Sequence, residues 1–248
     1  MTNTTTDFGY QQVPIDEKIN LVEKVFSSVA DNYDLMNDLM SAGIHRLWKK
    51  IAVQHCAIKT GQVILDLAGG TGDLTSAFAR ELGPSGQIIL ADLNADMLKI
   101  GRDKLINQAL IKNIAYLQVN AECLALASNS FDCVSMAFGL RNVTTKEAAL
   151  AEILRVLKPG GKLVILEFSK PLYPYLTKLY DLYSFKILPL LGNLVAHDAD
   201  SYRYLAESIR MHPDQEQLKG MMQAAGFGHC SYYNLTSGIC AIHKGFKF

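Results

Sequence analysis

The chain has 248 residues, and 49% of them are hydrophobic, which is enough for one α/β domain with a sizeable core. Its 24 lysines and arginines balance its 24 aspartates and glutamates, so the formal net charge is zero, and no basic block indicates nucleic-acid binding. The five cysteines contain no Cys-x-x-Cys, which argues against disulfides and a zinc site and favours a cytoplasmic protein.

Two helical regions are predicted ahead of the first strand. Apolar residues recur on one helical face over Ile15–Val29, and a second helical region runs from about Tyr33 to His55. Residues 1–12 are polar and lack the basic start and apolar core of a secretory signal, so we expect no export. We interpret residues 1–60 as a helical lid.

From Val63 onward, strand and helix patterns alternate as in the βαβ units of a parallel sheet. The predicted strands are Val63–Leu67, Gln87–Leu93, Ile114–Val119, Phe131–Phe138 and, after a turn at Lys158–Gly161, Lys162–Phe168. The predicted helices are Asp73–Leu82, Ala95–Gln108, Lys146–Leu157 and about Asp214–Ala225. Alternating patterns over Phe227–Leu235 and Gly238–Lys244 then predict a terminal antiparallel hairpin.

An insertion over residues 171–213 is too long for an ordinary connection in an α/β unit. It is rich in aromatic and aliphatic residues, but Lys186 and Pro189 interrupt its apolar run, which is too short to span a bilayer. We expect a cap over an apolar substrate that contacts a membrane surface peripherally. The alternative is a helical hairpin that only thickens the core.

The stretch from Val63 to Thr75 changes from a short apolar run into the three glycines Gly69, Gly70 and Gly72. Such a turn lets the backbone approach a ligand closely, and the positive end of the following helix faces that ligand. The third glycine of G-x-G-x-x-G is missing and no lysine follows Gly72, which argues against a nicotinamide cofactor and a P-loop. A tight turn without a ligand is the alternative.

Acidic residues around this turn predict a cationic nucleoside. Asp66 and Asp73 suit a ligand with cationic groups and no phosphate, while Asp92 ends the second strand, where a carboxylate can accept both ribose hydroxyls. S-adenosylmethionine meets these requirements. Because no His, Asp and Glu cluster has metal-ligand spacing, we predict no metal.

Three segments carry a resemblance to known enzymes. Leu65-Asp-Leu-Ala-Gly-Gly-Thr-Gly72 resembles the first motif of class I methyltransferases. Signatures similar to those of the ubiquinone/menaquinone biosynthesis C-methyltransferases are Tyr33-Asp-Leu-Met-Asn37 with Gly43-Ile-His45 and Trp48, and Arg155-Val-Leu-Lys-Pro-Gly-Gly161 running to Glu167-Phe-Ser169. Phe138–Asn142 and Ser201–Ile209 also look like segments of this family, so the resemblance covers nearly everything from Val25 to Phe248.

The resemblance implies one Rossmann-like α/β domain over residues 1–248, with a seven-stranded, mostly parallel sheet and an antiparallel C-terminal strand. The lid (1–60) would be followed by a cofactor-binding core (61–170), the cap (171–213) and a C-terminal helix and hairpin (214–248). The implied activity is S-adenosylmethionine-dependent C-methylation of a polyprenylated quinol, either 2-polyprenyl-6-methoxy-1,4-benzoquinol or demethylmenaquinol or both. The resemblance also allows two kinds of protein partner, namely a second copy of the chain in a homodimer and other proteins of a quinone-biosynthesis complex.

The same resemblance assigns cofactor contacts by position. Thr71 and the Gly69–Gly72 backbone would hold the methionine end, Asp92 the ribose, and Asn120 with Ala121 the adenine. From the residues alone, two other functions remain possible. One is an enzyme, a nicotinamide-dependent quinone oxidoreductase, and the other is a non-catalytic cofactor-binding scaffold.

Arg141 and Asn142, just past the fourth predicted strand, are the predicted catalytic residues. A quinol ring carbon becomes nucleophilic when a neighbouring hydroxyl ionises, and a dry cap favours the reaction because opposite charges cancel in it. Arg141 would lower the pKa of the phenol or orient a water, and a surface salt bridge is its alternative. Asn142 would orient a quinol oxygen.

Four further residues are weaker candidates. Tyr33 and Tyr202 would contact the quinol head, although both are equally suited to a core position with a bonded hydroxyl. His45 and His197 are candidate bases, although a single histidine is more often structural.

Overall fold

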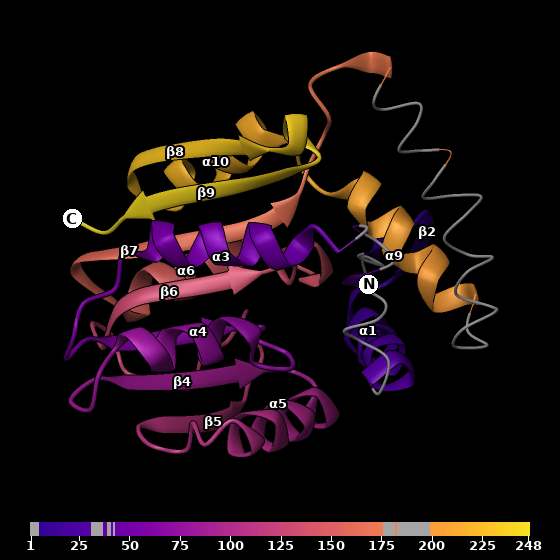
Figure 1. Cartoon of the computed structure of the whole chain (residues 1–248). Coiled ribbons are helices and arrows are strands. Elements are labelled where there is room, and N and C mark those ends of the chain that lie inside the picture. The colour runs from indigo at the N-terminus through magenta and orange to yellow at the C-terminus, as the bar shows by residue number, and fades with distance from the viewer. Residues whose placement is uncertain (1–4, 31–36, 39–40, 42, 176–181, 183–198) are drawn as a thin grey trace.

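The computed structural model describes residues 5–30, 37–38, 41, 43–175, 182 and 199–248. Its main feature is a seven-stranded sheet in the order β5-β4-β3-β6-β7-β9-β8 (Figure 1). The strands are β3 (Val63–Leu67), β4 (Gln87–Asp92), β5 (Ile114–Gln118), β6 (Phe131–Ala137), β7 (Leu157–Phe168), β8 (Gly228–Leu235) and β9 (Cys240–Phe246).

The central strands are parallel and buried on both faces, as their continuous apolar sequences predict. In β3, the side chains of Ile64, Leu65 and Leu67 are buried, and the strand pairs in parallel with β4 on one side and β6 on the other. Only β9 reverses direction, since it is antiparallel to both β7 and β8. The predicted antiparallel C-terminal strand is therefore confirmed.

Helices cover both faces of the sheet. Their bounds are α1 (Ile15–Val29), α3 (His45–Cys56), α4 (Asp73–Glu81), α5 (Ala95–Asn107), α6 (Lys146–Val156), α9 (Ala199–Met211) and α10 (Gln215–Ala224), with short 3₁₀ turns at η2 (Leu140–Asn142) and η4 (Thr236–Gly238). One apolar core contains Trp48 of α3 and Phe78 of α4, and a second contains Ile153 of α6 and Leu218 of α10. In Figure 1, α1 and α9 lie beyond the carboxyl ends of the parallel strands, which is where ligands bind in such sheets.

Three elements differ from the sequence prediction. A hairpin of β1 (Thr5–Phe8) and β2 (Gln11–Pro14) precedes α1, and Phe8 stacks on Tyr204 with ring centroids 4.1 Å apart. The predicted turn at Lys158–Gly161 is an irregularity within the longer β7, because Phe131 pairs with Leu157 and Cys133 already pairs with Lys162. Helix α9 occupies the last part of the insertion, for which the sequence analysis gave helices only in the alternative of a helical hairpin.

The predicted cap falls mostly outside the described residues. Of residues 171–213, the structure describes 171–175, 182 and 199–213, and the apolar run around Lys186 and Pro189 is not among them. Within the described part of the chain, no helix has the length and apolar character needed to cross a membrane.

Candidate functional site

A cavity, here called the main cavity, lies at the carboxyl ends of β3, β4 and β6. Helix α1 forms one wall through Ile19, Val22, Glu23 and Phe26, which the sequence prediction did not assign to the site. The remaining described lining residues follow the strand ends, namely Ala68, Gly70, Asp92, Leu93, Asn94, Met97, Val119, Asn120, Ala121, Glu122, Phe138, Gly139, Asn142, Val143 and Thr144.

The glycine turn has the backbone conformation that its sequence requires. Gly70 and Gly72 have φ angles of 54° and 75°, in the left-handed region that favours glycine. A Cβ atom on Gly69 would clash with Leu90, and a Cβ atom on Gly101 of α5 would lie 2.9 Å from the Gly70 carbonyl oxygen. The turn is therefore packed between β4 and α5, and only its outer side is open to a ligand.

Asp92 lies where the sequence predicted it, at the end of β4 and in the main cavity. The Gly70 N–H donates to its Oδ2 atom at 2.8 Å, and the Asn94 N–H donates to its Oδ1 atom at 2.9 Å. Burial raises the pKa of this carboxyl, and the backbone N–H bonds oppose that rise. Since a carboxylate oxygen accepts about two hydrogen bonds, each oxygen keeps capacity for a ligand hydroxyl.

A smaller cavity on the other side of Ala68 is lined by Gly69 and Thr71, together with Asp66, Asp73, Lys49, Leu74 and Ala137. Ala68 borders both cavities, so the two are adjacent. Of the predicted methionine-end residues, Gly69 and Thr71 line the smaller cavity, whereas Gly70 lines the main cavity and is bonded to Asp92.

The carboxylate of Asp66 is held by three hydrogen bonds beneath this turn. Its Oδ2 atom accepts from the Thr75 N–H at 3.0 Å and the Thr75 hydroxyl at 2.7 Å, and its Oδ1 atom accepts from the Ser135 hydroxyl at 2.8 Å. Burial raises its pKa to about 6, although these hydrogen bonds lower it in part. Asp66 therefore fixes the start of α4 against β6, and because it also lines the smaller cavity, its contact with the cofactor stays a prediction.

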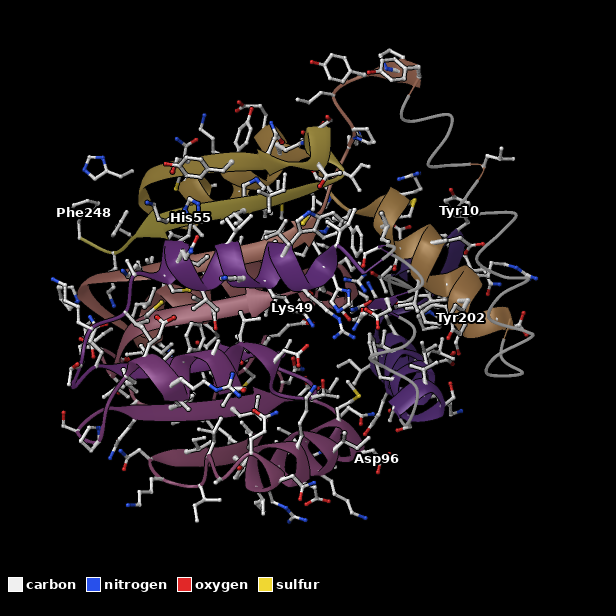
Figure 2. The ribbon with its side chains drawn as sticks, in the orientation of Figure 1. Tyr10, Lys49, His55, Asp96, Tyr202 and Phe248 are labelled. Carbon is white, nitrogen blue, oxygen red and sulfur yellow. The ribbon has the colours of Figure 1, made fainter. Side chains whose placement is uncertain are left out.

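Asp73 is balanced by two lysines. Lys49 of α3 and Lys104 of α5 approach its carboxylate oxygens at 2.6 and 2.7 Å. Burial alone would raise the pKa of Asp73, but the two ammonium groups outweigh it and hold that pKa well below its usual range. Figure 2 shows Lys49 on the side of α3 that faces α4. Asp73 therefore offers no uncompensated charge to a ligand, contrary to the sequence expectation.

Asn120 and Ala121 both line the main cavity, in the loop after β5. The Asn120 Oδ1 atom accepts from the Glu122 N–H at 2.9 Å, and a Glu122 carboxylate oxygen accepts from the Thr144 N–H at 2.9 Å. These bonds tie the loop after β5 to the start of α6. The two residues that sequence reasoning assigned to the adenine are brought together with Asp92.

The charged side chains of the main cavity are all acidic. Glu23, Asp92 and Glu122 line it, and no lysine, arginine or histidine is found among its described lining residues. A low-dielectric pocket with carboxylates and no cation favours a positively charged ligand.

Arg141 does not line the main cavity. Its guanidinium forms a buried ion pair with Glu167 at 2.9 Å, donates to the Phe138 carbonyl oxygen and lies 5.6 Å from the centroid of the Phe168 ring. The backbone N–H of Arg141 also donates to Glu167, at 3.2 Å. The ion pair is buried, so the surface alternative is wrong, and a direct contact between Arg141 and an acceptor stays a prediction. The sequence prediction missed the partner Glu167.

Asn142 does line the main cavity, one residue after Arg141. The hydroxyl of Tyr204 in α9 donates to its Oδ1 atom at 3.1 Å. Because this oxygen is held, the amide NH₂ is the group that Asn142 has available for a ligand. Tyr204 lies in a segment that carried the family resemblance, but nothing in the sequence indicated this contact.

The weaker candidates lie elsewhere. Tyr202 of α9 is 1% exposed, belongs to the apolar core that also contains Trp48 and Phe78, and is not among the described lining residues of the main cavity. His45 is buried, its Nδ1 atom lies 2.9 Å from the Ser41 hydroxyl, and burial lowers its pKa. Tyr33 and His197 lie outside the described residues. No group of three metal-ligating side chains was found in the described part of the chain.

Comparison with solved structures supports the fold. A methyltransferase from Aquifex aeolicus, described as dependent on S-adenosylmethionine, matches with a TM-score of 0.63 and 16% identity, over 86% of this chain and 97% of that one. Phosphoethanolamine N-methyltransferase 2 of Haemonchus contortus, solved in complex with S-adenosyl-L-methionine, matches with a TM-score of 0.59 and 16% identity, over 80% and 52%. At such identities the likeness concerns the fold alone.

Sequence comparison gives the family. The ubiquinone/menaquinone biosynthesis C-methyltransferase UbiE of Marinomonas sp. (strain MWYL1) is 60% identical over 98% of this chain and 97% of its own length. The model of the ubiE/COQ5 methyltransferase family matches residues 12–247. The chain belongs to the ubiE/COQ5 methyltransferase family.

Proposed function

We propose that this protein uses S-adenosylmethionine to methylate a ring carbon of a polyprenylated quinol in ubiquinone and menaquinone biosynthesis. The observation that carries the proposal is the acidic main cavity, with Asp92 at the end of β4 and no basic described lining residue. A nicotinamide dinucleotide carries phosphates, which this cavity would repel, whereas a sulfonium nucleoside carries none. The activity named for the relative that is 60% identical agrees with this choice.

The two adjacent cavities suit the two halves of the cofactor. In this proposal Asp92 accepts the ribose hydroxyls, and Asn120 with Ala121 borders the adenine. Gly69 and Thr71 hold the methionine end in the smaller cavity, where Lys49 also lies. The bound cofactor would supply an electrophilic methyl group, which the glycine turn would direct toward the Phe138–Asn142 segment.

Asn142 is our candidate for the residue that contacts the acceptor. Its amide group is held by Tyr204 and is left to donate to a quinol oxygen. Arg141 acts through this segment, since its ion pair with Glu167 fixes η2 and so holds Asn142 at the main cavity. A hydrogen bond from the Asn142 amide to the quinol oxygen favours the ionised form of the phenol and thereby makes the ring carbon more nucleophilic.

The polyprenyl tail requires an apolar surface. In the described part of the insertion, Leu172, Tyr173, Tyr175 and Leu182 are between 48% and 66% exposed. Exposed aromatic and aliphatic side chains gathered in one segment are typical of a membrane-interface contact. We therefore propose that this segment meets the membrane surface peripherally while the quinol head reaches the main cavity.

The test is methyl transfer by the purified protein from S-adenosylmethionine with a labelled methyl group. Demethylmenaquinol and a 2-polyprenyl-6-methoxy-1,4-benzoquinol are supplied separately in detergent. We expect label on the ring carbon of at least one acceptor and little transfer by the Asp92→Ala variant. Cofactor binding without transfer to either acceptor would favour the non-catalytic scaffold, and tight NADH binding would favour the oxidoreductase.

A further inference from the structure

A third cavity, here called the polar cavity, lies across residues 143–144 from the main cavity, and Thr144 borders both. Its volume is about 100 Å³. A water needs only about 10–15 Å³ measured in this way, so the polar cavity has room for several waters or one polyatomic ion. It is lined by Thr6, Asp7, Gly9, Lys18, Arg141, Thr144, Lys146, Tyr204, Ser208 and Met211.

Two lysines from different helices converge at this cavity. Lys18 of α1 is only 3% exposed, and its Nζ atom lies 3.4 Å from the carbonyl oxygen of Val143. The Nζ atom of Lys146 in α6 lies 3.3 Å from the same oxygen. Among the described residues, neither ammonium group has an ion-pair partner. Both cations instead interact with the same neutral carbonyl oxygen, that of Val143.

Carboxylates lie near the two lysines, but none of the described ones is in ion-pair contact with either ammonium group. Asp7 is the described carboxylate of the lining, and its Oδ1 atom also accepts from Gln12. Arg141 adds a third cation, but Glu167 neutralises it. Burial, and then the charge of Lys146, lower the pKa of Lys18 to about 8 despite the opposing attraction of Asp7 and Glu122.

The pKa of Lys146 is lowered as well. Burial lowers the pKa of Lys146, although Glu147, Glu167, Asp7 and Glu122 oppose that fall. His212, buried near Lys146 and Arg141, has a pKa held far below its ordinary value by burial and by those cations, so it stays neutral and adds no compensation of either sign.

The start of α6 adds to the positive potential. Lys146 is the first residue of this helix, where the macrodipole is positive and a cation is unfavourable. The N-cap residue Thr145 forms no side-chain cap hydrogen bond. A helix N-terminus and two ammonium groups around an enclosed polar space together form the donor set that binds oxyanions.

We propose that the polar cavity binds a small oxyanion, a phosphate or a carboxylate, through Lys18 and Lys146. Buried charges in proteins are normally paired, and an anion here would supply the pairing that the described residues do not. Because Lys18 lies on α1, one residue before Ile19 of the main cavity, the bound anion ties the lid helix to the start of α6. Inorganic phosphate and a lipid phosphate share this chemistry.

The experiment uses the full chain at constant ionic strength, with chloride replaced stepwise by inorganic phosphate or acetate. Binding is measured by calorimetry and by the shift in Tm, for the wild type, Lys18→Met and Lys146→Met. Lys24→Met is the matched control, because Lys24 is an exposed lysine of the same helix. We expect wild type and control to bind equally, and each cavity variant to bind roughly tenfold or more weakly.

A second measurement does not depend on the ligand. In buffer without oxyanions, Lys18→Met should unfold at a higher temperature than the wild type, because it removes a buried cation that has no ion-pair partner among the described residues. If soluble anions fail but vesicles of phosphatidylglycerol bind with the same lysine dependence, the site takes a lipid phosphate. Equal anion binding by all four proteins, or no binding of either source by the wild type, would overturn the proposal.

Discussion

The two cavities on either side of residues 143–144 differ in the sign of their buried charge. The main cavity has Glu23, Asp92 and Glu122 without a described basic lining residue, whereas Lys18 and Lys146 meet at the polar cavity without an ion-pair partner among the described residues. A buried charge that the protein leaves uncompensated indicates a ligand of opposite sign. We therefore expect a cation in the first cavity and an anion in the second.

In the Arg141–Glu167 ion pair, by contrast, each buried charge is compensated by a partner within the protein. Both side chains are 1% exposed, and they pair at 2.9 Å. An interaction of this kind holds structure together and is not available to a ligand without rearrangement.

The largest expected effect is on stability, in Arg141→Ala. Removing the guanidinium leaves Glu167 buried without its cation, which should lower the free energy of unfolding by about 3–5 kcal/mol. Denaturant unfolding measures the loss, and the double variant Arg141→Met with Glu167→Leu should recover part of it. A fully stable but inactive Arg141→Ala would instead show that the guanidinium acts directly on the acceptor.

The next largest effect is on cofactor affinity, in Asp92→Ala. The change removes a carboxylate that would accept ribose hydroxyls, and it also frees the Gly70 and Asn94 N–H groups. Calorimetry should show binding of S-adenosylmethionine weakened by about 1.5–3 kcal/mol. Asp73→Asn is a useful comparison, because that carboxylate is already balanced by Lys49 and Lys104 and should matter less to affinity. Equal losses in both variants would contradict the distinction between them.

The smallest expected effect is a change in pH dependence, in Asp66→Asn. Burial raises the pKa of Asp66 from 3.8 to about 6, so the folded chain binds this proton more tightly than the unfolded chain. Its contribution to stability is therefore fully present below about pH 4 and is lost as the pH rises through 6. The variant should lack this loss, and its stability relative to the wild type should rise by about 2 kcal/mol between pH 4 and 7. Parallel pH profiles would show that Asp66 does not titrate in this range.

The parallel strands, the helices between them and the position of Asp92 could all be predicted from the sequence. These features depend on local patterns, namely apolar runs, helical periodicity and glycines at a turn, and parallel strands bring their carboxyl ends to one edge of a sheet. Gly70, Asp92, Asn120, Ala121 and Asn142 meet in the main cavity for this reason.

The tertiary structure alone decided which charges are compensated. Arg141 and Glu167 are 26 residues apart, and Tyr204 and Asn142 are 62 apart, so no local pattern indicates either contact. The hairpin of β1 and β2, the wall that α1 forms and the meeting of Lys18 with Lys146 likewise depend on distant segments. The sequence by itself determined which ionisable groups lie at the strand ends. Whether each of them faces a ligand or a partner depends on burial and distance, which only the folded chain defines.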